Sequence, residues 1–237
     1  MMKYILLIFL VSVNSIAQDS VKLEYSTFSD IIPVSKINIS IADSLYQFIE
    51  KELPFIDFGD CNNCSYRAHL MAAILEKNFP GVNTAKVWLF ADYKRESQED
   101  IYRYKSYIHL SSDAGCNKWG YHVAPILIIE QGNSIDTMVI DHSTQRKPEK
   151  LKEWAEKLVQ KGSKGFIIIK DKKYYKFPDN ENNRFIDTRK EWIDDKKEPL
   201  YDDNFSISLE KVLLARYGFW EPWTFRKHYK EFKELLE

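Results

Sequence analysis

The sequence predicts an α+β fold in which helices pack around a central antiparallel sheet. Apolar residues recur at helical spacing in five segments, and short apolar runs typical of strands occur between them. Two of these runs flank Gln131-Gly132-Asn133, a turn sequence that predicts an antiparallel hairpin. The length of 237 residues is sufficient for one domain with a sizeable core.

The first 17 residues have the features of a secretory signal peptide. Lys3 supplies the positive charge, residues 4–13 the apolar core, and Ser15-Ile16-Ala17 the small residues of a cleavage site. The apolar run is shorter than the ~20 residues that would span a bilayer. We therefore expect a secreted or periplasmic protein in an oxidising compartment, with a single domain over residues 18–237. Residues 18–39 are irregular in pattern, and whether they form a propeptide or part of the fold is open.

The charge balance argues against two classes of partner. The chain has 34 Lys and Arg against 35 Asp and Glu, a net charge of -1. It has neither a basic stripe nor a basic amphipathic helix. We expect no nucleic acid partner, and no membrane association after the signal is removed.

The remaining elements follow from periodicity and from breaker residues. Ser40 is the expected cap of the first helix, and Pro54 its end. A charged amphipathic helix is closed by Gly162. Helices are predicted over residues 41–53, 64–78, 149–161, 209–218 and 224–236, and strands over 85–90, 101–110, 123–130, 135–140 and 165–169.

Cys64 stands at the predicted start of the second helix, where the helix dipole and unpaired N–H groups favour a thiolate. His122 opens one strand of the hairpin, and Asp141 closes its partner. Cross-strand neighbours lie ~5 Å apart at Cβ, so the two side chains can meet. Thiolate, imidazole and carboxylate together form the outline of a nucleophilic triad. Each residue alone has a plainer interpretation, as a packing, core or turn residue.

Three stretches of this sequence resemble the bacterial protein-glutaminase family, secreted cysteine amidohydrolases that deamidate glutamine side chains within proteins. The matching stretches are Cys64-x-x-Arg67-Ala68-His69-x-Met71, Trp119-x-Tyr121-His122-Val123-Ala124 and Ile140-Asp141-x-Ser143. The resemblance implies that Cys64 is the nucleophile, His122 its partner and Asp141 the orienting group. It also implies an architecture similar to transglutaminase and papain-like enzymes. His142 departs from the family pattern, which has proline there, and this puts the loop after Asp141 in doubt.

Further expectations concern residues near this triad. The backbone N–H of Cys64 is a natural oxyanion donor, and the Asn62 and Asn63 amides are weaker candidates. Trp119 and Tyr121 are candidates for substrate contact.

The two other cysteines of the chain also enter the prediction. Because the nucleophile must remain a thiol, Cys61 and Cys116 are expected to form a disulfide. A Cys61–Cys64 bridge, or three free thiols, are the alternatives.

Several other functions are compatible with the same residues. Transglutaminase or peptidase chemistry would use the same triad with a protein or peptide substrate. The Cys61-x-x-Cys64 spacing also occurs in dithiol redox proteins, although a helix and a loop, rather than a βαβ unit, precede it. A zinc site lacks a second paired ligand motif. A binding domain without activity is a further alternative. We expect a monomer that needs no cofactor or metal and acts on a protein or peptide with an accessible glutamine.

Overall fold

The computed structural model describes residues 21–25, 35, 37–56, 63–91, 108–109, 117–119, 121–131, 134–159, 161–162, 164–172, 206–217 and 221–236. The helices in these ranges are α1 (Ile39–Glu52), α2 (Cys64–Asn78), α3 (Leu151–Leu158), α5 (Ser206–Tyr217) and α6 (Pro222–Leu236). The strands are β1 (Lys22–Tyr25), β2 (Ala85–Ala91), β3 (Ile108–His109), β4 (Asn117–Trp119), β5 (Tyr121–Gln131), β6 (Ser134–Val139), β7 (Glu149–Lys150) and β8 (Lys164–Asp171).

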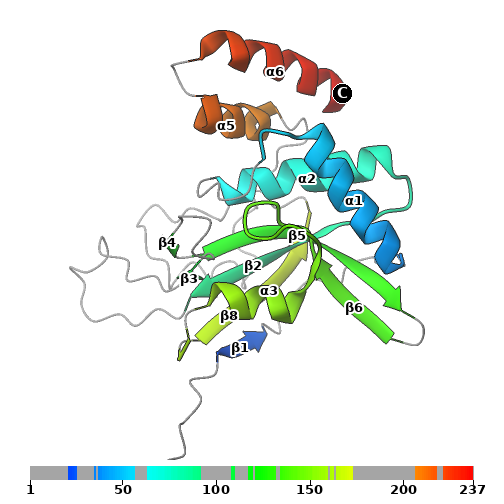
Figure 1. Cartoon of the computed structure of the whole chain (residues 1–237), viewed down its shortest axis with the longest axis vertical. Helices are drawn as coiled ribbons and strands as arrows, with labels where there is room; N and C mark the ends of the chain where they lie inside the picture. Colours follow the sequence, from blue (N-terminus) through cyan, green and yellow to red (C-terminus); the bar gives the residue numbers. More distant parts are fainter. Residues whose placement is uncertain are drawn as a thin grey trace, which may run out of the picture.

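Six strands form the main sheet in the order β1-β8-β2-β5-β6-β7 (Figure 1). All neighbours in it are antiparallel except β1 and β8, which are parallel. The predicted α+β fold is thus confirmed, with the difference that the sheet is mixed. β3 and β4 form a separate two-stranded sheet.

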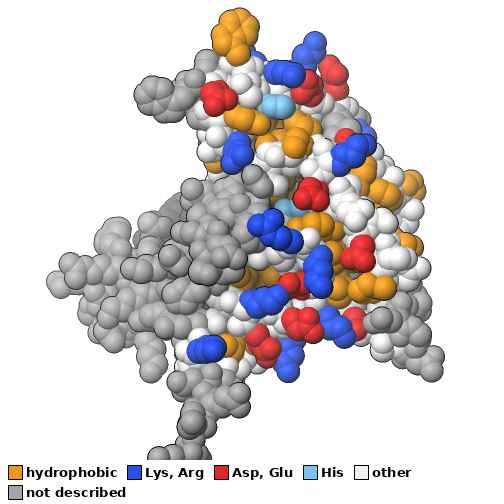
Figure 2. Space-filling view, in the orientation of Figure 1, with side chains coloured by type: hydrophobic (Ala, Val, Ile, Leu, Met, Phe, Trp, Pro, Cys, Tyr) orange, Lys and Arg blue, Asp and Glu red, His pale blue; other side chains and the backbone are white. Residues whose placement is uncertain are grey.

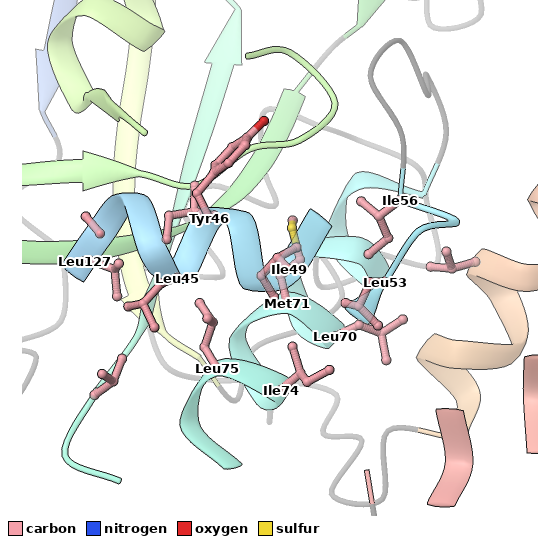
Figure 3. Packing of buried hydrophobic residues seen from close by; sticks show 14 of the residues in the cluster. Leu45, Tyr46, Ile49, Leu53, Ile56, Leu70, Met71, Ile74, Leu75 and Leu127 are labelled. Atoms are coloured by element: carbon pink, nitrogen blue, oxygen red, sulfur yellow. The ribbon is translucent and has the colours of Figure 1, made fainter. Parts of the chain in front are cut away.

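Helices cover both faces of the main sheet. Alternate residues of β2, such as Val87 and Leu89, pack with Trp154 and Leu158 of α3 on one face. The other face packs against α1 and α2, and α5 and α6 lie beyond α2 (Figure 1). Figure 3 shows how the apolar sides of α1 and α2 meet in this larger core. The residues labelled there include Leu45 and Ile49 of α1, Leu53 just after it, and Leu70, Met71, Ile74 and Leu75 of α2.

The cap of α1 differs from the prediction. Asn38, not Ser40, precedes the helix, and its side-chain oxygen accepts a hydrogen bond of 3.0 Å from the backbone N–H of Ile41. Ser40 instead donates its hydroxyl to the same oxygen at 2.6 Å. Both residue types are good caps, so sequence alone did not distinguish them. The predicted third helix is also shorter, since Glu149 and Lys150 form β7.

The described parts of the irregular segment 18–39 belong to the fold. β1 extends the sheet alongside β8, and Ile37 is a buried core residue that bridges to Ile129 of β5. Ser35 is buried and donates its hydroxyl to the backbone carbonyl of Asn83 at 3.2 Å. The signal sequence predicted over residues 1–17 lies outside the described residues.

The surface mixes charges of both signs, as the near-neutral net charge predicts. On the face in Figure 2, lysines and arginines alternate with acidic side chains among the described residues. Surface ion pairs such as Lys150–Asp136 at 2.8 Å belong to this pattern. None of the helices within the described ranges combines the length and apolar composition needed to cross a membrane.

Candidate active site

Cys64 is the first residue of α2 and is a half-buried free thiol. The residue before it, Asn63, has the left-handed backbone conformation (φ 59, ψ 30), which asparagine tolerates better than most residues. Its side chain does not cap α2 but donates to the carbonyl of Lys211 on α5 at 3.2 Å. The positive end of the helix is therefore directed at Cys64 without a capping side chain.

His122 is the second residue of β5 and is fully buried. Its Nε2 donates a hydrogen bond of 2.7 Å to Oδ2 of Asp141. The imidazole also lies beside the indole of Trp154, with ring centroids 5.9 Å apart. Because Nε2 is hydrogen-bonded to the carboxylate, Nδ1 is the ring nitrogen available to the Cys64 thiol, which acts on the pKa of His122.

Asp141 lies just after β6 and is fully buried. Its carbonyl closes a turn by accepting the N–H groups of Thr144 and Gln145 at 3.3 and 3.1 Å. The carboxylate accepts from Nε2 of His122, Oγ1 of Thr144, Nε1 of Trp154 at 3.0 Å and the backbone N–H of Ser143 at 3.1 Å. Burial raises the pKa of Asp141, but these donors and His122 outweigh it and hold the pKa well below its usual range.

The hairpin brings His122 and Asp141 together, though not as direct cross-strand neighbours. Ile126 is opposite Val139, and the N–H of Ile140 bonds to the carbonyl of Pro125. In this register His122 and Asp141 are diagonal neighbours. The turn that begins at Asp141 directs its carboxylate to the imidazole.

The electrostatics of the site favour a charged thiolate–imidazolium pair. Burial alone would raise the pKa of the Cys64 thiol, but the hydrogen bond and charge of His122, the charge of Arg67 and the backbone N–H of Val123 lower it. Burial acts to lower the pKa of His122, yet Asp141 and Cys64 raise it to about 9. Such a pair is the form in which a cysteine attacks a carbonyl carbon.

Comparison with known proteins identifies the family. A family model described as glutaminase matches residues 40–158, half of the chain, including Cys64, His122 and Asp141. The chain belongs to the glutaminase family. This member is accordingly a hydrolase that acts on the carboxamide C–N bond of glutamine. No curated protein sequence matches it.

Solved structures of similar fold include three that bear on this glutaminase. The crystal structure of a protein-glutaminase aligns with a TM-score of 0.53 and 18% identity, covering 78% of this chain and 90% of the other. The protein-glutaminase from Chryseobacterium proteolyticum aligns with a TM-score of 0.50 and 17% identity, covering 77% and 88%. A pro-protein-glutaminase aligns with a TM-score of 0.51 and 18% identity, covering 82% and 64%. At these identities the likeness establishes the fold.

His142, which stands where the resemblance expected proline, anchors the loop after Asp141 in this glutaminase. Its ring stacks on Tyr46 of α1, with centroids 3.8 Å apart, and its Nε2 donates to the Tyr46 carbonyl at 2.9 Å. The Tyr46 hydroxyl in turn donates to the carbonyl of Gln145 at 2.6 Å. Burial lowers the pKa of His142 to about 4, so its ring is neutral at pH 7.

Two residues of this glutaminase that the sequence analysis did not single out contact Asp141 directly. Trp154 is buried on α3, but its N–H bond to the carboxylate gave no signal in the sequence. Thr144 was likewise an unremarked loop residue. Its position three residues after Asp141 fits a turn that bonds back to an aspartate.

The other predicted site residues are placed as follows. Tyr121 is half-buried and packs against Trp88 and Phe90 in a cluster that also contacts Cys64. Trp119 is in β4, and its side chain lies outside the described part of the structure, as do Asn62, Cys61 and Cys116. Within the described residues no group of three His, Cys, Asp or Glu side chains could hold a metal ion.

Proposed function

We propose that this glutaminase deamidates glutamine side chains of proteins or peptides through a covalent thioester, with Cys64 as nucleophile, His122 as acid and base, and Asp141 as the orienting group. One observation carries the proposal. A buried His122–Asp141 pair, bonded at 2.7 Å, lies beside a half-buried free thiol at a helix start. The likeness in fold to solved protein-glutaminases supports the choice of protein-bound glutamine.

The first half of the reaction forms the thioester. The Cys64 thiolate attacks the carboxamide carbon of the glutamine side chain, and the C=O electrons move to oxygen. As the tetrahedral intermediate collapses, the C–N bond breaks and Nδ1 of His122 gives its proton to the departing nitrogen, which leaves as ammonia. Asp141 stabilises the imidazolium through Nε2 and fixes the ring orientation.

The second half releases glutamate. His122, now neutral, takes a proton from a water molecule that attacks the thioester carbon. The C–S bond breaks and Cys64 returns as the thiolate beside the imidazolium. Throughout, the backbone N–H of Cys64 is the proposed oxyanion donor, a contribution of about 3 kcal/mol when well aimed. The Asn63 amide is engaged with Lys211, which argues against it as a second donor.

The wider biology of the protein is part of the same proposal. Residues 1–17 direct export, and residues 18–237 form one catalytic domain that acts as a monomer. Trp119 and Tyr121 are proposed to contact the substrate. A Cys61–Cys116 disulfide leaves Cys64 as the reactive thiol. Alkylation of the unreduced protein followed by peptide mapping tests this pairing: labelling of Cys64 alone supports it, and labelling of Cys116 contradicts it.

Ammonia release tests the function directly. The purified mature protein is expected to release ammonia from a casein-like protein but not from free glutamine. Cys64→Ser and His122→Ala should each abolish release, whereas Asp136→Asn, a change of a partly exposed aspartate on β6, should leave it unchanged. Peptide mass mapping locates the new glutamates. Cleavage of the peptide backbone would instead indicate a peptidase. Cross-links to amines in place of new glutamates would indicate a transglutaminase, because both reactions release ammonia.

A further inference from the structure

Arg67 is an almost fully buried arginine, 1% exposed, on the helix that carries Cys64. Arginine keeps its positive charge under all ordinary conditions, and burying such a charge is costly unless it is compensated. It lies three residues after Cys64, so the two side chains share one face of α2, and helical side chains lean toward the N-terminus. Its guanidinium is thus directed toward the first turn of the helix.

The guanidinium of Arg67 connects two parts of the site. Nη2 donates a hydrogen bond of 3.2 Å to Oγ of Ser143, which is also buried. The backbone N–H of Ser143 donates to Oδ1 of Asp141 at 3.1 Å. Arg67, Ser143 and Asp141 therefore link the helix of the thiol to the turn of the carboxylate, across 76 residues of sequence.

The charge of Arg67 also acts on the thiol. Burial raises the pKa of Cys64, and the opposing influences are His122 on β5, Arg67 on α2 and the backbone N–H of Val123. Of these, His122 and Arg67 are the charged groups. A positive charge near a thiol favours its ionised form.

We propose that Arg67 is a positioning residue of the candidate site, whose buried guanidinium joins the Cys64 helix to the Asp141 turn and supplies a fixed positive charge to the thiolate. This rests on the proposed function of Cys64. The role is distinct from that of His122, because the charge of Arg67 does not change with pH or during turnover. The Cys64 sulfur therefore has the same positive neighbour when it attacks as a thiolate and when it leaves the thioester as one.

The test is the pH dependence of Cys64 alkylation by iodoacetamide, followed by peptide mapping in four variants. Arg67→Met should move the midpoint of alkylation upward by about 1 pH unit, which makes alkylation about tenfold slower well below the midpoint. Arg67→Lys keeps the charge and should keep the midpoint, but it lacks the planar fork and should lower kcat. Ser143→Ala should likewise keep the midpoint and lower kcat. Arg146→Met, the same change at an exposed arginine, is the control and should alter neither.

An unchanged midpoint in Arg67→Met, with only a loss of thermal stability, would overturn the proposal. If Arg67→Met does not fold, a midpoint in Arg67→Lys that rises by about 1 would overturn the charge role, and full kcat in Ser143→Ala would overturn the link. Alkylation needs no turnover. A protein that fails to release ammonia but shows these midpoints would therefore contradict the proposed function and not the role of Arg67.

Discussion

Asp141→Asn removes one negative charge from a carboxylate that accepts four hydrogen bonds in a fully buried position. Oδ2 receives three of these bonds, and Oδ1 receives the fourth, from the backbone N–H of Ser143. Asparagine has one oxygen and one NH2 group in the same shape. Whichever way its amide turns, an N–H group faces at least one donor.

The least costly orientation keeps the oxygen on the side of His122, Thr144 and Trp154. It then leaves the N–H of Ser143 facing the NH2 group, and an unsatisfied buried donor costs about 1–3 kcal/mol. We therefore expect the free energy of unfolding to fall by about 2 kcal/mol. Activity should fall much further, because the imidazolium of His122 loses the charge that stabilises it. The matching change in other nucleophilic triads lowers kcat by about 10⁴.

The assay pairs denaturant unfolding with ammonia release. Asp136→Asn is the matched control, since Asp136 lies on β6, just before the turn of Asp141, but pairs with Lys150 at the surface, where an ion pair contributes little to stability. Full activity in Asp141→Asn would refute its role in orienting His122. A loss of stability no larger than that of Asp136→Asn would refute the hydrogen-bond argument.

Three further predictions follow from the surroundings of the site. Trp154→Phe keeps the ring beside the imidazole but removes a donor to the carboxylate, so kcat/KM should fall about tenfold, and an unchanged value would contradict this role. kcat/KM should also fall as pH rises through about 9, where His122 loses its proton, and a profile flat to higher pH would show that its charge is not needed. Because burial lowers the pKa of His142 from 6.5 to about 4, its contribution to stability is present above pH 6.5 and is lost as pH falls toward 4, a loss of roughly 3 kcal/mol. In urea unfolding, His142→Phe should lose less stability than the unchanged protein as pH falls from 6.5 to 4. The same pH dependence of stability in both proteins would contradict this role of His142.

The fold elements with strong periodicity were predictable from the sequence. Helix α2 has the predicted bounds, Cys64–Asn78, because its apolar stripe is regular and Pro80-Gly81 stops it. The hairpin of β5 and β6 was predictable for a similar reason, since two apolar runs flank a short turn. Local patterns also explain why Cys64, His122 and Asp141 could be singled out before their distances were known.

Features that depend on long-range contacts were not predictable. Nothing local in Lys22–Tyr25 indicates that this strand pairs in parallel with β8, more than 100 residues later. Asn38 rather than Ser40 caps α1 because the helix begins at Ile39. The side chain of either residue type can accept the capping hydrogen bond, so the local sequence does not decide between them. The hydrogen bond of Trp154 was not predictable either. A buried tryptophan gives a helix the same apolar periodicity whether or not its N–H donates to a carboxylate.

Trapping the covalent intermediate tests the central claim most directly. The protein is mixed with a glutamine-containing peptide, quenched in acid during turnover, digested and mapped by mass. We predict an adduct on Cys64 whose mass equals that of the peptide less ammonia and which hydroxylamine removes. In Cys64→Ala both this adduct and ammonia release should be missing. An adduct on another residue, or continued deamidation by Cys64→Ala, would contradict the assignment of Cys64 as the nucleophile.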